Sequence, residues 1–200
     1  MIKAIVFDIG MVLLIEDRDT QYAALAKEFG YSLDSFYAIR AKYVDRCASG
    51  ELSGVDYIRT IGKTLGIRDL DRYYEQWLFY CKANTRFDLD VKRLIERLKE
   101  RYVLATLTNI IPPHQIIREQ LNVYQDFQLK LFSYQEGLKK PDVRFYQLLI
   151  RTLHFAPEEI LFIDDCKAYV DVALHLGMKA ILFEDAVQLE TDLRAGGINW

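Results

Sequence analysis

Apolar residues recur along the chain in short, nearly continuous runs of strand length. The first run covers residues 2–7, and four more cover residues 102–107, 129–132, 160–163 and 178–183. Runs without polar alternation are typical of strands that are buried on both faces of a parallel sheet. Helical or loop segments separate the runs, so the pattern predicts an α/β protein with a doubly wound parallel sheet.

Amphipathic helices are predicted between these strands. Residues 91–98 carry apolar side chains at helical spacing with charged residues on the other face, and residues 145–153 show a similar pattern. A third helix over residues 168–176 is expected to end at Gly177, because glycine commonly terminates helices. Such helices cover both faces of a parallel sheet and give three layers, α/β/α.

The interval from residue 15 to residue 86 does not follow this alternation. It shows several helical stretches in succession and no strand pattern. Ser53 and Asp56 have the spacing of a capping pair at the start of the third stretch, and the fourth covers residues 70–82. Helices of this size pack as a small bundle, so we expect an all-helical insert that returns to the sheet near Phe87.

Composition and charge then narrow the class of protein. The 200 residues are enough for one domain with a modest insertion, and 51% of them are hydrophobic. The 26 basic and 29 acidic residues give a net charge of −3 without long blocks of one sign. We therefore expect no nucleic acid and no membrane as partner, but a small molecule. Three cysteines without paired spacing and no apolar stretch of about 18 residues indicate reduced thiols and a cytoplasmic location.

Polar side chains follow the apolar runs at the points where ligands bind in an open parallel sheet, beyond the carboxyl ends of its strands. They are Asp8 after the first run, Thr108 and Asn109 after the second, Lys139 and Lys140 in the loop after the third, and Asp164 and Asp165 after the fourth. Taken singly, each could be a turn residue, a helix cap or a solvated lysine. Together they suit phosphoryl transfer, because carboxylates hold Mg²⁺ while Lys and Thr bind phosphoryl oxygens.

Four ordered segments carry a resemblance to a known family. They are Val6-Phe7-Asp8-Ile9-Gly10-Met11-Val12, Leu107-Thr108-Asn109, Ser133-Tyr134-Gln135-Glu136-Gly137-Leu138-Lys139-Lys140-Pro141-Asp142, and Phe162-Ile163-Asp164-Asp165 leading to Leu176-Gly177-Met178. With these motifs the chain resembles the haloacid dehalogenase superfamily of Mg²⁺-dependent phosphatases, in the subclass that has a helical cap after the first strand. The resemblance covers essentially the whole chain.

This resemblance implies a Rossmann-like core and a division into domains. The core would comprise residues 1–15 and 86–200, and the helical cap would comprise residues 16–85. It also implies a phosphatase of small phosphorylated metabolites, such as sugar phosphates, that forms an aspartyl-phosphate on Asp8.

The resemblance further implies roles for the residues of the four motifs. The phosphoryl group would be bound by Thr108, Asn109 and Lys140, and Lys140 would also keep Asp8 ionised. The Mg²⁺ ligands would be Asp8, the backbone carbonyl of Gly10, and Asp164 with Asp165, of which Asp165 resembles the direct ligand.

The sequence departs from the family pattern in the first motif. Two residues after the nucleophile the family usually places a second aspartate, which protonates the leaving group and then activates water, but this chain has Gly10. Some similar phosphatases also carry glycine there, usually followed by Asn or Gly rather than Met11. General acid and base help is worth about 10²- to 10⁴-fold, so we expect a slow enzyme or one that relies on a residue of the cap. Tyr169 is a second departure, at a position where the family often has Asn or Asp.

The same departure leaves alternatives open. Dehalogenases of the superfamily also lack the second aspartate, but they lack the adjacent carboxylate pair as well. Phosphonatases need a cap lysine that the sequence does not single out. The alternative from a different functional class is a non-catalytic or nearly inactive relative that binds a phosphorylated ligand. The aromatic residues of the segment 73–80 are expected in the core of the bundle, and His114, His154 and His175 are assigned no chemistry.

Overall fold

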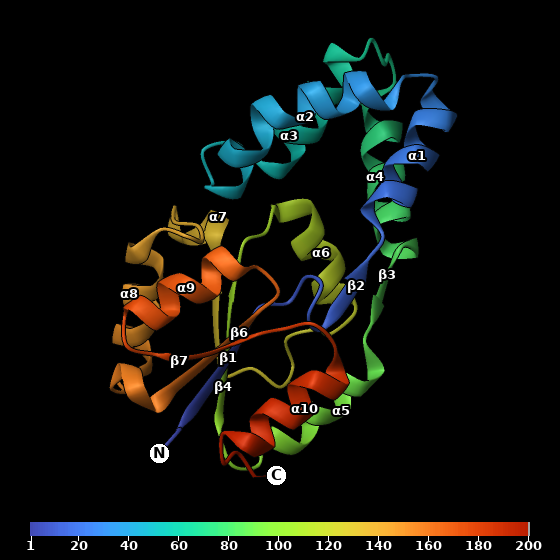
Figure 1. Ribbon diagram of the computed structural model, residues 1–200. Coiled ribbons are helices and arrows are strands. Elements are labelled where there is room, and N and C mark those ends of the chain that lie inside the picture. The colour runs from blue at the N-terminus through green and yellow to red at the C-terminus, as the bar shows by residue number, and fades with distance from the viewer. Residues whose placement is uncertain (200) are drawn as a thin grey trace.

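Five parallel strands form the central sheet, in the order β5-β4-β1-β6-β7 (Figure 1). The computed structural model describes residues 1–199. The strands are β1 (Ala4–Phe7), β4 (Val103–Thr108), β5 (Leu129–Phe132), β6 (Ile160–Asp164) and β7 (Lys179–Leu182). β1 lies at the centre between β4 and β6, and all four of its residues are buried. The predicted parallel sheet is thus confirmed.

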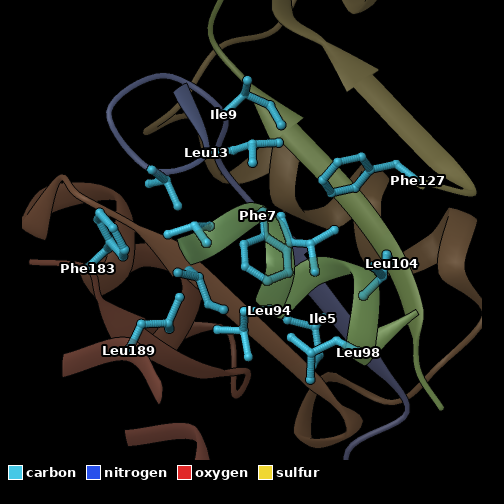
Figure 2. Close-up of a cluster of buried hydrophobic side chains, with 14 of the residues drawn as sticks. Ile5, Phe7, Ile9, Leu13, Leu94, Leu98, Leu104, Phe127, Phe183 and Leu189 are labelled. Carbon is cyan, nitrogen blue, oxygen red and sulfur yellow. The ribbon is translucent and has the colours of Figure 1, made fainter. Parts of the chain in front are cut away.

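Helices cover both faces of the sheet, as the sequence predicts. One face carries α5 (Leu89–Leu98) and α10 (Ala186–Ala195), and the other carries α8 (Val143–Leu153) and α9 (Lys167–His175). Successive residues of β1 point to opposite faces, so Ile5 and Phe7 join the first cluster of apolar side chains while Ala4 and Val6 join the second. Figure 2 shows the first cluster, in which Phe7 lies among residues of α5 and neighbouring strands.

Shorter elements connect these layers. They are α6 (Pro112–Gln120), the single turn α7 (Ser133–Glu136) and the 3₁₀ helix η1 (Pro157–Glu159). The N-terminal cap residue of α9 is Cys166, whose backbone N–H donates to Oδ1 of Asp164 at 2.9 Å. Within residues 1–199, no helix has the length and apolar character that a membrane crossing requires.

The segment after the first strand is helical, as predicted. It contains α1 (Arg18–Phe29), α2 (Leu33–Ala48), α3 (Gly54–Thr64) and α4 (Leu70–Ala83), which we call the helical insert. Ser53 caps α3 by accepting a hydrogen bond from the backbone N–H of Asp56. Tyr73 and Trp77 of α4 are fully buried in the insert's own apolar cluster. These two aromatic residues are bundle core, as expected, whereas Phe79 is 60% exposed and does not fit that expectation.

Two short strands that the sequence did not predict frame the insert. β2 (Leu14–Glu16) and β3 (Thr85–Phe87) pair in antiparallel fashion where the chain enters and leaves the insert. The backbone N–H of Asp17 extends this ribbon by donating to the carbonyl of Asn84 at 2.9 Å. Strands of three residues are too short to show a period of two, which is why the pattern gave no sign of them.

The helical insert touches the core through two glycines. A Cβ on Gly50, just after α2, would lie 2.2 Å from the backbone oxygen of Tyr134 in α7, and Gly50 has a φ of +79°. A Cβ on Gly54, at the start of α3, would lie 2.6 Å from Pro113 of α6. Ile111 of the core also belongs to the insert's apolar cluster. The insert and the core thus pack closely at α6 and α7, which follow the neighbouring strands β4 and β5.

Candidate active site

Three neighbouring strands end in polar residues at the same edge of the sheet. Asp8 follows β1, Thr108 is the last residue of β4, and Asp164 is the last residue of β6. Because β1 pairs in parallel with both β4 and β6, these strand ends lie side by side. All three side chains are buried, with Asp164 fully so. The structure therefore brings together the residues that the sequence analysis placed at strand ends.

Lys140 links two of these carboxylates. Its Nζ lies 3.0 Å from Oδ1 of Asp8 and 2.6 Å from Oδ2 of Asp164. Burial alone would lower the pKa of Lys140, but the charges of Asp8 and Asp164 raise it above its ordinary value. Burial also raises the pKa of Asp164, against the effect of Lys140. Lys140 is therefore a fixed cation beside Asp8 and cannot serve as a base at neutral pH.

Asn109 holds the loop that carries Lys140. Its Nδ2 donates to the backbone carbonyl of Lys140 at 2.9 Å, and its Oδ1 accepts from the backbone N–H of Lys140 at 2.8 Å. Tyr169 also contacts Lys140, because Nζ of Lys140 lies over the Tyr169 ring at 5.0 Å from its centre. The side chain of Asn109 is thus engaged in positioning, and its predicted contact with a phosphate remains a prediction.

A buried ion pair that sequence reasoning missed stands next to Thr108. Arg118 of α6 donates from Nη2 and Nε to Oε1 of Glu16, at 2.7 and 3.0 Å, and from Nη1 to Oγ1 of Thr108 at 3.4 Å. Oε2 of Glu16 accepts from Arg18 at 2.6 Å. Burial would raise the pKa of Glu16, but Arg118 and Arg18 hold it well below its usual range. Glu16 is therefore ionised at neutral pH.

The same ion pair occupies the space around Gly10. A Cβ on Gly10 would lie 3.0 Å from Nη2 of Arg118 and 3.3 Å from Oε2 of Glu16. The place of the family's second aspartate is thus taken by a guanidinium and a carboxylate from other parts of the chain. Met11, which follows, has a φ of +61°, a conformation that favours the Gly or Asn usual at this position.

Three carboxylates offer a site that fits a divalent cation. One oxygen each of Asp8, Asp164 and Asp165 lies within 4.8 Å of the others. Both oxygens of Asp164 already accept hydrogen bonds, Oδ2 from Lys140 and Oδ1 from the backbone N–H of Cys166. Burial and the charge of Asp8 raise the pKa of Asp165, as expected for clustered carboxylates without a cation between them. Oxygen donors of this kind suit Mg²⁺.

A cavity of about 390 Å³ opens beside these residues, between the core and the helical insert. Lys140 and Asn109 line it from the core, and Arg18 and Arg40 line it from the insert. His114, which the sequence analysis left without a role, also lines this cavity and is buried. The sequence carried no signal for Arg118 and Arg40, because charged residues on amphipathic helices ordinarily face solvent.

Comparison with known proteins agrees with this arrangement. Residues 2–177 match the family model of the haloacid dehalogenase-like hydrolases, so the chain belongs to that family and is an enzyme of the hydrolase class. Among individual proteins, it is 27% identical over 211 residues to the D-ribitol-5-phosphate phosphatase of Bacteroides thetaiotaomicron, covering 96% of this chain and 97% of that protein.

Solved structures share the fold. A haloacid dehalogenase family enzyme of Bacteroides thetaiotaomicron, in complex with magnesium and inorganic phosphate, superimposes with a TM-score of 0.78 at 21% identity, covering 94% of this chain and 99% of that one. A 2-haloacid dehalogenase of Pseudomonas syringae gives a TM-score of 0.71 at 18% identity, covering 92% and 86%. Fold similarity therefore does not by itself choose between phosphatase and dehalogenase chemistry.

Proposed function

We propose that the protein is a Mg²⁺-dependent phosphatase of small phosphorylated metabolites that works through an aspartyl-phosphate on Asp8. The observation that carries this proposal is the buried group of Asp8, Lys140 and Asp164, with Asp165 beside it and Thr108 on the neighbouring strand. A carboxylate pair next to the nucleophile fits a metal-assisted phosphoryl transfer. It is not needed for dehalogenation, which leaves that alternative without support from the site.

In the first step, a carboxylate oxygen of Asp8 attacks phosphorus and the bond from phosphorus to the leaving oxygen breaks. Lys140 pairs with Asp8 at 3.0 Å, and Thr108 and Lys140 hydrogen-bond the phosphoryl oxygens. When bound by Asp8, Asp165 and the carbonyl of Gly10, Mg²⁺ would neutralise charge on the phosphoryl oxygens. Asp164 fixes Lys140 from the far side of the site.

In the second step, water attacks phosphorus and restores the carboxylate of Asp8, releasing inorganic phosphate. The leaving oxygen of the first step needs a proton, and the attacking water must lose one. Glu16 is the carboxylate nearest to position 10, but its ion pairs hold it in the ionised form, so it cannot donate a proton. We therefore propose that water supplies the proton to the leaving group in the first step, and that the proton of the attacking water passes to solvent in the second step.

We propose that residues 16–85, with the helical insert, act as the cap domain of this enzyme. The cavity between insert and core limits the substrate to a small molecule. Sugar phosphates and sugar-alcohol phosphates are the first compounds to test, because a relative aligned over nearly the whole chain is a D-ribitol-5-phosphate phosphatase.

The central test is the Asp8→Asn variant, which keeps the shape of the nucleophile but removes its attacking charge. We expect Mg²⁺-dependent release of phosphate from p-nitrophenyl phosphate to fall by about 10³-fold or more. Asp171→Asn, at an exposed aspartate of α9, is the matched control and should keep the wild-type rate. Equal rates in Asp8→Asn and wild type would overturn the aspartyl-phosphate mechanism. A wild-type protein that binds phosphate esters without hydrolysing them would favour the ligand-binding alternative.

A further inference from the structure

The cavity beside the candidate active site carries an excess of positive charge. Five of the described side chains that line it are cationic and one, Asp45, is acidic. Asp45 pairs with Lys139 at 2.6 Å, and Lys140 is balanced by Asp8 and Asp164. The excess must therefore come from the three arginines that line the cavity.

The structure provides fewer carboxylates than would be needed to pair each of these three arginines. Glu16 pairs with both Arg118 and Arg18, so one negative charge serves two guanidinium groups. Arg40 of α2 packs over the ring of Tyr22 at 5.8 Å, and no carboxylate pairs with it in the part of the chain that the structure describes. Two positive charges thus remain without a carboxylate, that of Arg40 and one of the pair formed by Arg118 and Arg18, of which the Arg18 side chain is 42% exposed.

Hydrogen-bonding groups in the same place also lack partners. Nε of Arg18, Nε of Arg40 and Nε2 of His114 are all buried and make no hydrogen bond. The His114 side chain is 6% exposed and lines the cavity together with both arginines. Buried polar groups without partners are rare in folded proteins and often mark the place of a bound group. Charge and hydrogen bonding therefore point to the same missing partner, an anion.

The proposed metal site does not account for this excess. Asp8, Asp164 and Asp165 carry three negative charges, and Lys140 with a bound Mg²⁺ would carry three positive ones. The phosphoryl dianion would add two negative charges that Mg²⁺, Lys140 and Thr108 bind at Asp8, whereas Arg40 lines the cavity from α2 of the helical insert. A neutral sugar could satisfy the hydrogen bonds but would leave Arg40 without an anionic partner.

We propose that the substrate carries a second anionic group, a carboxylate or a second phosphate, that is bound by Arg40 and Arg18 with His114 beside them. The inference rests on the proposed function, since it names the class of phosphate ester that the site takes. Guanidinium groups bind both carboxylate and phosphate through paired N–H donors. The substrate is thus a phosphorylated acid or a bisphosphate rather than a phosphorylated neutral sugar.

Binding to the Asp8→Asn variant in the presence of Mg²⁺ tests this inference without turnover. Calorimetry would compare phosphorylated straight-chain carboxylic acids of increasing length with alkyl phosphates of equal length and with the corresponding diol bisphosphates. We expect one charged series to bind about tenfold more tightly, or more, than the alkyl phosphates, with a preference that weakens as salt rises. The series that binds more tightly identifies the second anion.

Arg40→Gln in the same background should reduce this preference to about threefold or less. Arg59→Gln is the matched control, because Arg59 lies in the insert but is exposed and pairs with Asp71. The inference is wrong if alkyl phosphates bind as tightly as the charged compounds, or if the preference survives Arg40→Gln. The outcome is separate from that of the proposed function, because binding preference in Asp8→Asn does not depend on whether the wild type hydrolyses any ester.

Discussion

At position 10, the space that a side chain would fill belongs to the ion pair of Glu16 and Arg118. The pair is buried and anchored on Thr108, so it cannot swing aside without leaving a charge unpaired. A carboxylate introduced at position 10 would meet Arg118 but also the negative charge of Glu16. Where the family usually has a proton-donating aspartate, this chain therefore has the permanently charged pair of Glu16 and Arg118.

This exchange predicts how the rate depends on the leaving group. With no acid at position 10, nitrophenyl phosphate should react about 10²-fold faster, or more, than a simple alkyl phosphate, because nitrophenolate departs without a proton. Gly10→Asp alone should raise the alkyl phosphate rate little, since Glu16 crowds and repels the new carboxylate. Gly10→Asp combined with Glu16→Gln should raise it by about tenfold.

Steady-state rates on the two esters would check this prediction, with Gly10→Ala as the control for crowding without charge. Brisk wild-type hydrolysis of alkyl phosphates would contradict it. A double variant no faster than wild type on alkyl phosphates would contradict it as well.

His114 provides a prediction for the pH dependence of stability. Burial lowers its pKa from 6.5 to about 3, with Glu16 opposing and the nearby arginines assisting. The unfolded chain then takes up a proton below pH 6.5 that the folded protein refuses, so stability falls as the pH drops from 6.5 towards 3. The loss from this group should be about 2 kcal/mol at about pH 5.

Urea unfolding of wild type and His114→Gln at neutral pH and at about pH 5 would measure this loss. The variant should lose about 2 kcal/mol less on acidification than the wild type does. His175→Gln, at an exposed histidine of α9, should behave as wild type. An equal acid sensitivity in His114→Gln and wild type would show that His114 is protonated in the folded protein.

At the scale of elements, the sequence predicted those features that repeat a local pattern. β1 and its neighbours are apolar on both faces, so their ends, and with them Asp8, Thr108 and Asp164, could be located without a structure. Glu16 and Arg118 are 102 residues apart in the chain, and only the folded arrangement brings them together. The ribbon of β2 and β3 was not predicted, because strands of three residues are too short to show an alternation of apolar and polar positions.

The turn after α2 offers a test of how the helical insert meets the core. Gly50 and Gly66 both have positive φ, at +79° and +81°, but only a Cβ on Gly50 meets another atom, the backbone oxygen of Tyr134. Alanine at either position should cost about 1 kcal/mol from backbone strain. Gly50→Ala should in addition push the insert away from α7.

We therefore expect Gly50→Ala to lower kcat/KM by about tenfold and Gly66→Ala to leave it within twofold of wild type. Thermal unfolding and steady-state kinetics of the two variants would separate strain from displacement. Similar activity in both variants would mean that the contact between Gly50 and Tyr134 does not position the site.

For the molecule as a whole, the cluster of Asp8, Asp164 and Asp165 predicts that Mg²⁺ stabilises the fold. Three carboxylates this close repel one another until a cation lies between them. Mg²⁺ at about 100 times its Kd should add about 2.7 kcal/mol, which corresponds to a rise in Tm of about 5 to 10 °C.

Asp165→Ala should abolish most of this rise, whereas Asp171→Ala should preserve it. Differential scanning calorimetry with and without Mg²⁺ is the appropriate measurement. A wild-type Tm that does not respond to Mg²⁺ would argue against a metal site and for the dehalogenase or ligand-binding alternatives.

The ribbon of β2 and β3 has a consequence for the order in which the chain folds. β1 must pair with β4 across the whole insert, and closing so long a loop is slow. The helical insert has an apolar cluster of its own and can condense through contacts that are close in sequence. Once the insert has folded, β2 can pair with β3, and this pairing brings the end of β1 close to the start of α5, which leads to β4 (Figure 1). We therefore expect early folding of the insert to speed the pairing of β1 with β4, because it shortens the loop that must close between them.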